Sequence, residues 1–257
     1  MCYDIKASLE AQLKRAKRSN DVAAILEIEQ KLIPYTDLPI HHKSGFAHPR
    51  LLIYTKDSPE VPIIAHWGLI PHWVKDAELK KKIWNSTINA RGETIAEKPS
   101  FRDAYKSKRC LVYLDGFYEH HHQDKQTYPF YIHTPDGEPL CLAGLWSEWT
   151  DRQSGEVWCS FSLVTTKSNE MMSLIHNNPK AKEGRMPVLL NEQEAETWLH
   201  ADVNQPEQKA ALEALIRPWN QSELNAHPVA KLRGKQYKGD IPEISDAVHY
   251  EELKLQL

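Results

Sequence analysis

The sequence lacks the features that define several common protein classes. No apolar run approaches the roughly 20 residues that cross a bilayer, and the first eight residues contain no hydrophobic signal region. The cysteines, at positions 2, 110, 141 and 159, show no paired spacing, which argues against a disulfide framework. There is no Gly-x-Ser-x-Gly elbow, phosphate-binding glycine loop or dinucleotide fingerprint. We therefore expect a cytoplasmic protein that contacts no membrane and uses no cofactor.

An excess of charge of one sign is also missing. The net charge is only −3, from 32 Lys and Arg residues against 35 Asp and Glu residues. A strongly basic, indiscriminate polyanion binder is therefore disfavoured, and any nucleic-acid contact would have to use a local basic groove. The 257 residues include eight Trp and ten Tyr, enough for a substantial core. Nothing in the sequence requires a partner subunit, so we expect a monomer.

The most informative residue present is Cys2, directly behind the initiator Met1. Removal of Met1 would leave a free α-amine and a thiol on adjacent carbons, a 1,2-aminothiol. In unperturbed peptides the amine titrates at about 7.7–8 and the thiol near 8.5. Such a pair can capture an aldehyde as an imine and then close a thiazolidine ring through sulfur. A lone cysteine without a role is the competing interpretation.

Hydrophobic periodicity predicts an α+β fold. Apolar residues recur at helical spacing between residues 9 and 33, with Asn20 and Asp21 placed to end one helix and cap the next. Strands are predicted at Leu51–Thr55, Pro62–Trp67, Cys110–Leu114, Tyr128–His133, Leu140–Ala143 and Val157–Thr166. Helices return at Asn169–Ile175, Glu192–Leu199 and Pro206–Ile216. We expect one domain over residues 1–257, with a mixed, barrel-like β core flanked by helices and a polar, irregular tail from residue 234.

Two segments could contact a nucleic acid. Trp67 and Trp73 flank a Gly and Pro turn, and exposed indole rings stack unpaired bases at about 1–3 kcal/mol per base. Further along, Asn89 could orient a carbonyl or sugar oxygen, while Arg91 and Arg102 could grip phosphates. The alternatives are that both Trp fill the core and that both Arg form ordinary surface ion pairs.

Two titratable residues are candidates for acid–base chemistry. Glu119 follows an apolar strand and turn, and burial there would raise its pKa toward neutrality. His176 ends a predicted helix and could shuttle a proton. Purely structural roles are the alternatives for both. The three histidines at positions 120–122 do not predict a metal site, because consecutive strand residues point to opposite faces.

In their order along the chain, the motifs resemble those of the SOS response-associated peptidase-like (SRAP) family, whose members process abasic sites in DNA. The matching motifs are Cys2, Trp67-Gly68-Leu69-Ile70-Pro71, Asn89-Ala90-Arg91, Asp115-Gly116-Phe117-Tyr118-Glu119, Thr165-Thr166, Ile175-His176, Arg185-Met186-Pro187 and His227-Pro228-Val229. Each motif alone is weak, but the ordered set, from residue 2 to about residue 231, is specific. The resemblance implies one α+β domain with a β-rich core and a positively charged channel for single-stranded DNA.

The resemblance also implies a reaction and a division of roles. The protein would recognise abasic sites in single-stranded DNA, at damaged DNA in the nucleoid, and form a lasting thiazolidine crosslink that protects the lesion. Cys2 would be the nucleophile, Asn89 would orient the reacting end or the sugar, Glu119 would act as acid–base, and His176 would assist ring opening. The DNA contacts would come from Trp67, Trp73, Arg91, Arg102, Thr165 and Arg185.

Two departures from the family pattern are visible. Most members begin Met-Cys-Gly-Arg, whereas this chain has Tyr3 and Asp4, so an acidic residue stands where a phosphate-binding Arg is usual. A segment of eight residues, 177–184, separates His176 from Arg185 and is longer than usual. Two other functions stay open: a thiol peptidase or amidohydrolase with an N-terminal nucleophile, and a single-strand binder in which Cys2 is incidental.

Overall fold

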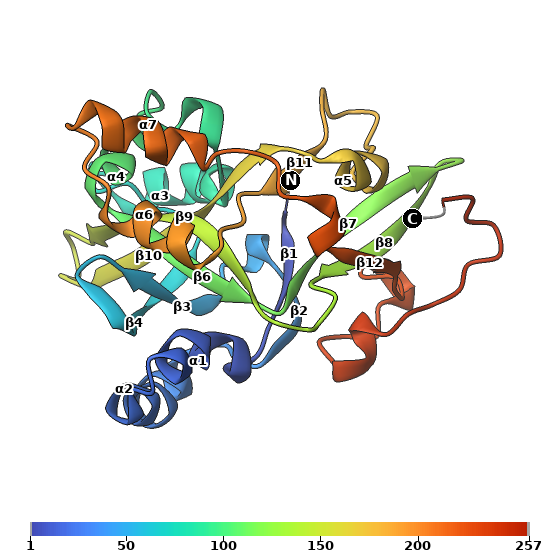
Figure 1. Ribbon diagram of the computed structural model, residues 1–257, viewed down its shortest axis with the longest axis horizontal. Helices are drawn as coiled ribbons and strands as arrows, with labels where there is room; N and C mark the ends of the chain where they lie inside the picture. Colours follow the sequence, from blue (N-terminus) through green and yellow to red (C-terminus); the bar gives the residue numbers. More distant parts are fainter. Residues whose placement is uncertain (1, 256–257) are drawn as a thin grey trace.

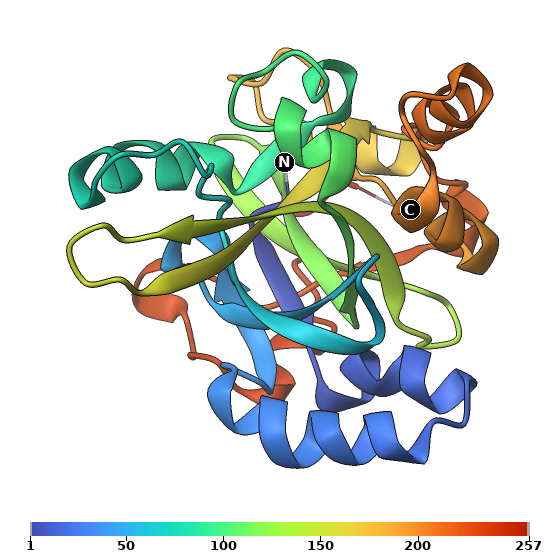
Figure 2. The same ribbon diagram turned by 90° about the vertical axis from the view of Figure 1, so that its left-hand side faces the viewer.

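The core is a closed five-stranded β-barrel, as a computed structural model that describes residues 2–255 shows (Figures 1 and 2). Around the barrel the strands follow in the order β10, β4, β3, β6 and β9, and β9 pairs with β10 again to close it. Only the β10–β4 pairing among these is parallel. The bounds are β3 Arg50–Thr55, β4 Ser58–Trp67, β6 Arg109–Leu114, β9 Leu140–Thr150 and β10 Val157–Lys167. The predicted barrel-like core of an α+β fold is confirmed.

The barrel strands β3 and β6 are buried on both faces, because alternate side chains enter different apolar clusters. On β6, Val112 and Leu114 join the interior cluster, which also receives the apolar face of a second sheet. Leu111 and Tyr113 point the other way and pack with Trp198 of an outer helix. This accounts for the continuous apolar runs in the sequence, since a strand covered on both faces has no polar side.

A second sheet carries the N-terminus. Its order is β12-β8-β7-β1-β2, with β1 Asp4–Ala7, β2 Ile40–Ser44, β7 Gly116–Gln123, β8 Gln126–His133 and β12 Asn225–Pro228. Of these strands, β8 was predicted with bounds, and the histidines at 120–122 of β7 were placed on a strand without bounds. The other three strands are short and lack an apolar pattern. Two three-residue strands, β5 Asn89–Arg91 and β11 Arg185–Pro187, pair with the C-terminal part of β10.

Helices cover the outside of the barrel. They are α1 Leu9–Arg18, α2 Val22–Glu27, α3 Ala77–Trp84, α4 Arg102–Ser107, α5 Glu170–Ile175, α6 Glu192–His200 and α7 Pro206–Ala214. Asp21 caps α2, as predicted, by accepting the Ala24 amide at 2.9 Å. Helices α3 and α4 were not predicted. A π turn, Ile28–Leu32, and a 3-10 turn, Ile33–Tyr35, follow α2. Between residues 2 and 255, no helix has both the length and the apolar character needed to cross a membrane.

The C-terminal segment, residues 229–255, is tied to the second sheet. It is largely irregular, as expected, with 3-10 turns at Gly234–Gln236 and Pro242–Ser245. The Asp240 carboxylate accepts the amides of His41 and His42 at 2.7 and 2.9 Å. The Lys6 ammonium donates to the Ser245 hydroxyl at 2.7 Å. The segment therefore packs directly against the strands beside Cys2.

Candidate active site and nucleic-acid interface

Cys2 lies two residues before β1, and two neighbours fix the backbone of Cys2 and Tyr3. The Asn89 side-chain amide donates to the Cys2 carbonyl oxygen at 2.7 Å, and the Gly45 amide donates to the Tyr3 carbonyl at 2.7 Å. Asn89 comes from β5, which pairs with β10 through Leu163, so the edge of the barrel holds the main chain of Cys2. Asn89 therefore contacts Cys2 directly, and its role in orienting a reacting group stays a prediction.

The Cys2 thiol is fully buried. Burial raises the pKa of the Cys2 thiol well above its usual value, and the nearby charge of Glu119 raises it further. The sulfur is therefore a neutral thiol at neutral pH, not a standing thiolate. Nucleophilic attack by this sulfur requires a base that takes its proton.

Glu119 on β7 is suited to that task. Its side chain is buried, and burial raises its pKa from 4.5 to about 7. The pairing of β1 with β7, in which Asp4 lies opposite Tyr118, brings this carboxyl to the strand that follows Cys2. A carboxyl that titrates near neutrality can both accept and return a proton.

His176 completes the polar group around Glu119. Its Nδ1 lies 4.0 Å from Glu119 Oε1, 3.1 Å from the Arg185 carbonyl oxygen and 3.2 Å from the Arg185 amide nitrogen. Burial lowers the pKa of His176 to about 4, so the imidazole is neutral at pH 7. The position follows from α5, whose N-cap is Asn169, accepting the Met172 amide at 2.8 Å.

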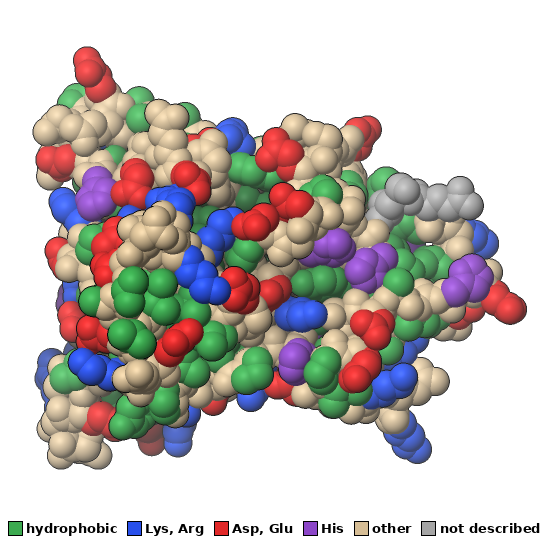
Figure 3. All heavy atoms as spheres, turned by 60° about the horizontal axis from the view of Figure 1, so that its bottom comes forward, with side chains coloured by type: hydrophobic (Ala, Val, Ile, Leu, Met, Phe, Trp, Pro, Cys, Tyr) green, Lys and Arg blue, Asp and Glu red, His purple; other side chains and the backbone are tan. Residues whose placement is uncertain are grey.

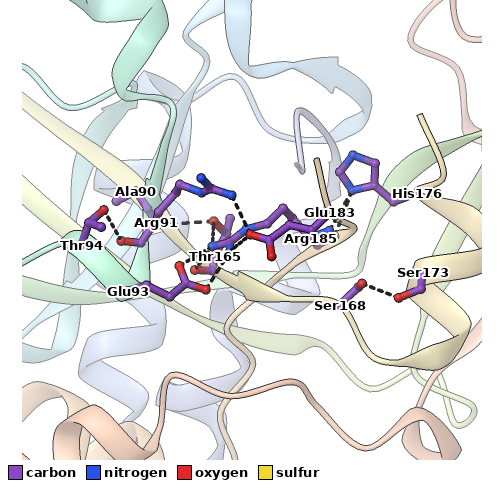
Figure 4. A network of polar contacts seen from close by, with 10 residues as sticks. All are labelled: Ala90, Arg91, Glu93, Thr94, Thr165, Ser168, Ser173, His176, Glu183 and Arg185. Carbon is purple, nitrogen blue, oxygen red and sulfur yellow. Dashed lines mark hydrogen bonds and ion pairs between the residues drawn. The ribbon is translucent and has the colours of Figure 1, made fainter. Parts of the chain in front are cut away.

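Arg185 and Thr165 do not present their side chains to DNA, which corrects that part of the sequence-based assignment (Figure 4). The Arg185 guanidinium is only 3% exposed and pairs with both oxygens of Glu93, at 2.7 and 2.8 Å. It also donates to the Thr165 carbonyl at 2.8 Å. Thr165 itself is fully buried. The bidentate pair ties β11 to the 3-10 turn Gly92–Thr94, and the bond to Thr165 ties β11 to β10. Both contacts fix Arg185, whose backbone contacts His176 Nδ1.

The predicted base-stacking role of Trp67 is likewise wrong for this structure. The ring is fully buried, donates to the Ile88 carbonyl at 3.0 Å and lies parallel to Phe161 in the core. Trp73 is 37% exposed, and its indole N–H donates to the Pro99 carbonyl at 3.1 Å. Trp67 is thus a core residue, and of these two tryptophans only Trp73 is exposed enough to contact a base.

Three hollows meet at Tyr3. The first, about 330 Å³, is lined by Glu119, His120, His176, Lys231 and Arg233. The second, about 410 Å³, is lined by Arg91, Lys180 and Lys182. The third, about 440 Å³, is lined by Asn89, Arg91, Lys98 and Phe101. Within the described residues, Trp73 and Arg102 line none of the three.

The exposed arginines differ in their surroundings. Arg91 is half exposed and pairs with Glu183 at 2.7 Å, beside the second and third hollows. Arg102 is also half exposed and lies 3.9 Å from Asp103, on α4. Figure 3 shows one face of the molecule, on which basic and acidic side chains are interspersed. On that face no continuous basic surface is present.

Several residues of the site escaped the sequence analysis. Tyr3 packs its ring against the exposed Phe46, with ring centres 5.1 Å apart. Glu93, Lys231 and Arg233 also belong here. Glu93 lies inside the Asn89–Thr94 motif, so it could have been found there, but nothing in the sequence connects residue 233 with residue 4. Residues 2–255 contain no group of three metal-ligating side chains arranged to hold an ion.

The barrel, the second sheet and the Cys2, Asn89, Glu119 and His176 constellation define a protein of the SRAP class. A family model described as SOS response associated peptidase (SRAP) matches residues 5–235, and the chain belongs to this family.

Its relatives share a name. The chain is 35% identical over 182 residues to the abasic site processing protein YoqW of Bacillus subtilis, spanning 70% of this chain and 74% of YoqW. It is 30% identical over 236 residues to the abasic site processing protein HMCES of Xenopus tropicalis, spanning 82% and 66%. A crystal structure from Bacteroides thetaiotaomicron is similar at a TM-score of 0.79 and 31% identity, covering 96% of this chain and 100% of that one.

Proposed function

We propose that this protein captures abasic sites in single-stranded DNA by forming a thiazolidine crosslink through Cys2 after loss of Met1. Met1 itself lies outside the described residues. The observation that carries the proposal is the placement of Cys2, whose main chain is fixed by Asn89 next to a buried carboxyl with a pKa of about 7. The names of the relatives, abasic site processing proteins, agree with this substrate.

The reaction balances without a co-reactant. The open-chain form of an abasic deoxyribose carries an aldehyde. The α-amine of Cys2 adds to the aldehyde carbon, and loss of water gives an imine. The thiol then adds to the imine carbon, forming the C–S bond, while its proton is transferred to the ring nitrogen. One aldehyde and one aminothiol thus give one thiazolidine and one water.

Glu119 is the group that moves protons in both steps. Because its pKa is about 7, it can donate a proton to the departing water and then accept one from the thiol. The raised pKa of the Cys2 thiol means that the amine acts first and the sulfur second. The neutral His176, 4.0 Å from Glu119, would assist opening of the sugar ring.

The same raised pKa weighs against the thiol peptidase alternative. A peptidase of that class needs its sulfur as the first nucleophile toward an amide. A buried, protonated thiol is poorly suited to that role, whereas an iminium carbon formed beside it is a far better electrophile than an amide. No separate observation favours amide turnover.

The three hollows would carry the strand on either side of the lesion. Arg91 lies at the junction of the second and third hollows and would hold the backbone. Tyr3 and Phe46 offer an aromatic surface beside Cys2 for an unpaired base. Trp73 and Arg102, outside the hollows, would contact more distant nucleotides.

The direct test uses a single-stranded oligonucleotide with one abasic site. Wild-type protein should give a heat-resistant band on a denaturing gel, with an intact mass equal to protein plus oligonucleotide minus one water. A tetrahydrofuran analogue, which has no aldehyde, should give no such band. Cys2→Ala, and an extended N-terminus that retains a residue before Cys2, should also give none.

The same experiment separates the alternatives. A single-strand binder would shift the oligonucleotide on a native gel but leave no covalent band. A peptidase or amidohydrolase would turn over an amide substrate in a Cys2-dependent way without DNA. Absence of a covalent species with wild-type protein of verified N-terminus would refute the proposal.

A further inference from the structure

The charged residue that follows the nucleophile, Asp4, does not face the solvent. Its side chain is 2% exposed and lies between two basic partners. His42 Nε2 is 3.4 Å from one carboxylate oxygen, and the Arg233 guanidinium donates to the other at 2.8 Å. Asp4 is therefore an internal anchor for groups brought from elsewhere in the chain.

Arg233 occupies the exposed side of this pair. Its side chain is 62% exposed and lines the first hollow together with Glu119 and His176. The contact with Asp4 uses one nitrogen of a group that carries five N–H donors in a fixed plane. Asp4 also lines this hollow, but it is buried and paired, so the exposed member of the pair is the Arg233 guanidinium.

The C-terminal segment holds Arg233 at this place. His42, which contacts Asp4, also lies 2.8 Å from the hydroxyl of Tyr237 through its Nδ1. Asp240 accepts the amides of His41 and His42. Contacts of His41 and His42 on β2 with Tyr237 and Asp240 therefore fix the segment that carries Arg233.

Lys231 adds a second cation to the same hollow. Its ammonium lies 4.4 Å from the ring centre of Tyr128 and 5.0 Å from that of Tyr250. These two rings hold the lysine by cation–π contact without neutralising it. The first hollow thus combines the cations of Lys231 and Arg233 with two carboxyls, the paired Asp4 and the Glu119 that the proposed chemistry uses.

We propose that Arg233, oriented by Asp4, binds a backbone phosphate of the DNA strand next to the lesion. The C-terminal segment thereby builds a phosphate subsite in the first hollow, with Lys231 as its second cation. A planar guanidinium with free N–H groups matches a phosphodiester, and a site that shares a hollow with Glu119 reaches the nucleotide adjoining the reacting sugar. This inference rests on the proposed function, since it requires the strand to pass this hollow.

The test measures salt dependence and not covalent chemistry. Binding of a single-stranded oligonucleotide with one tetrahydrofuran site is followed by fluorescence anisotropy over a range of NaCl concentrations. Losing one phosphate contact should reduce the slope of log K against log salt by about 0.7 for single strands. Arg233→Gln should show that reduction and bind several-fold more weakly at low salt. Arg152→Gln, an exposed arginine in the turn between β9 and β10, is the matched control and should keep the wild-type slope.

Two further variants define the role of orientation. Arg233→Lys keeps the charge without the planar fork, so its slope should stay near wild type while its affinity falls. Asp4→Asn should weaken binding although it removes a negative charge, because the guanidinium loses its anchor. Tighter binding by Asp4→Asn would contradict the anchoring role.

An unchanged slope in a folded Arg233→Gln protein would overturn the phosphate subsite. Added inorganic phosphate, at constant ionic strength, that displaces the oligonucleotide from wild type but not from Arg233→Gln would reassign the subsite to free phosphate. The proposed function fails differently, through absence of a crosslink in wild type. Arg233→Gln should need a higher concentration of abasic DNA for half-maximal crosslinking, whereas absence of any crosslink in wild type counts against the proposed function and not against the subsite.

Discussion

Replacing Glu119 with glutamine should stabilise the folded protein at neutral and alkaline pH while it slows crosslinking. The side chain is buried and its pKa is raised from 4.5 to about 7, chiefly by burial. Glutamine keeps the shape and polarity of the protonated carboxyl but cannot ionise. The difference in unfolding free energy between the two proteins therefore measures the cost of the buried charge, because the packing of the site is unchanged.

The magnitude follows from the pKa difference between the two states. One pKa unit corresponds to about 1.4 kcal/mol, so ionising Glu119 in the folded protein costs about 3 kcal/mol more than in the unfolded chain. The folded state keeps its proton to higher pH. The free energy of unfolding is therefore highest below pH 4.5 on account of this group, and it falls as the pH rises to about 7.

The assay is urea unfolding, followed by tryptophan fluorescence, for wild type and Glu119→Gln at several pH values. Between about pH 5 and pH 8 the variant should gain about 2–3 kcal/mol relative to wild type. His120 and His176, whose pKa values are lowered to about 4 by burial, titrate in both proteins and cancel in the comparison. Parallel stability curves for the two proteins would refute the reasoning.

Further outcomes are expected at other positions. The pH profile of the wild-type crosslinking rate should change slope near pH 7, where Glu119 titrates, and the glutamine variant should lack that change. Asn89→Ala, but not the exposed Asn204→Ala, should slow crosslinking about 5- to 10-fold through loss of one hydrogen bond, measured by gel time courses. Glu93→Ala should lower the free energy of unfolding by about 2 kcal/mol in urea titration, because it strips the buried Arg185 of its bidentate partner. Lys80→Ala should lower it by about 1–2 kcal/mol, with partial recovery in Lys80→Met, because the Lys80 ammonium lies 3.1 Å from the ring centre of a tryptophan.

The barrel was accessible from the sequence because its strands are long and apolar on both faces. The apolar run of β6 can be recognised in the sequence alone, although its neighbouring residues Leu111 and Val112 pack in different clusters. Strands β1, β2 and β7 were not accessible in this way. Their short, polar segments become strands only because they pair with each other and with β8, and such pairing joins residues far apart in the chain.

The residues of the candidate site also differ in whether the sequence alone could identify their positions. Cys2, Asn89, Glu119 and His176 were found from motif order, and the structure brings them together. Trp67 did not keep its predicted role. A tryptophan beside a turn can face a ligand or the core, and only the packing of Ile88 and Phe161 around its ring decided between them.

By itself the sequence identified the groups that the proposed chemistry uses, because a thiol, a carboxyl and an imidazole are fixed by residue type. It also determined the barrel, because hydrophobic patterning is local. The tertiary structure decided which arginines are exposed, which carboxyl is buried and therefore titrates near neutrality, and that Asp4 is covered by Arg233. Burial and charge pairing depend on contacts between distant segments, so no local pattern can report them.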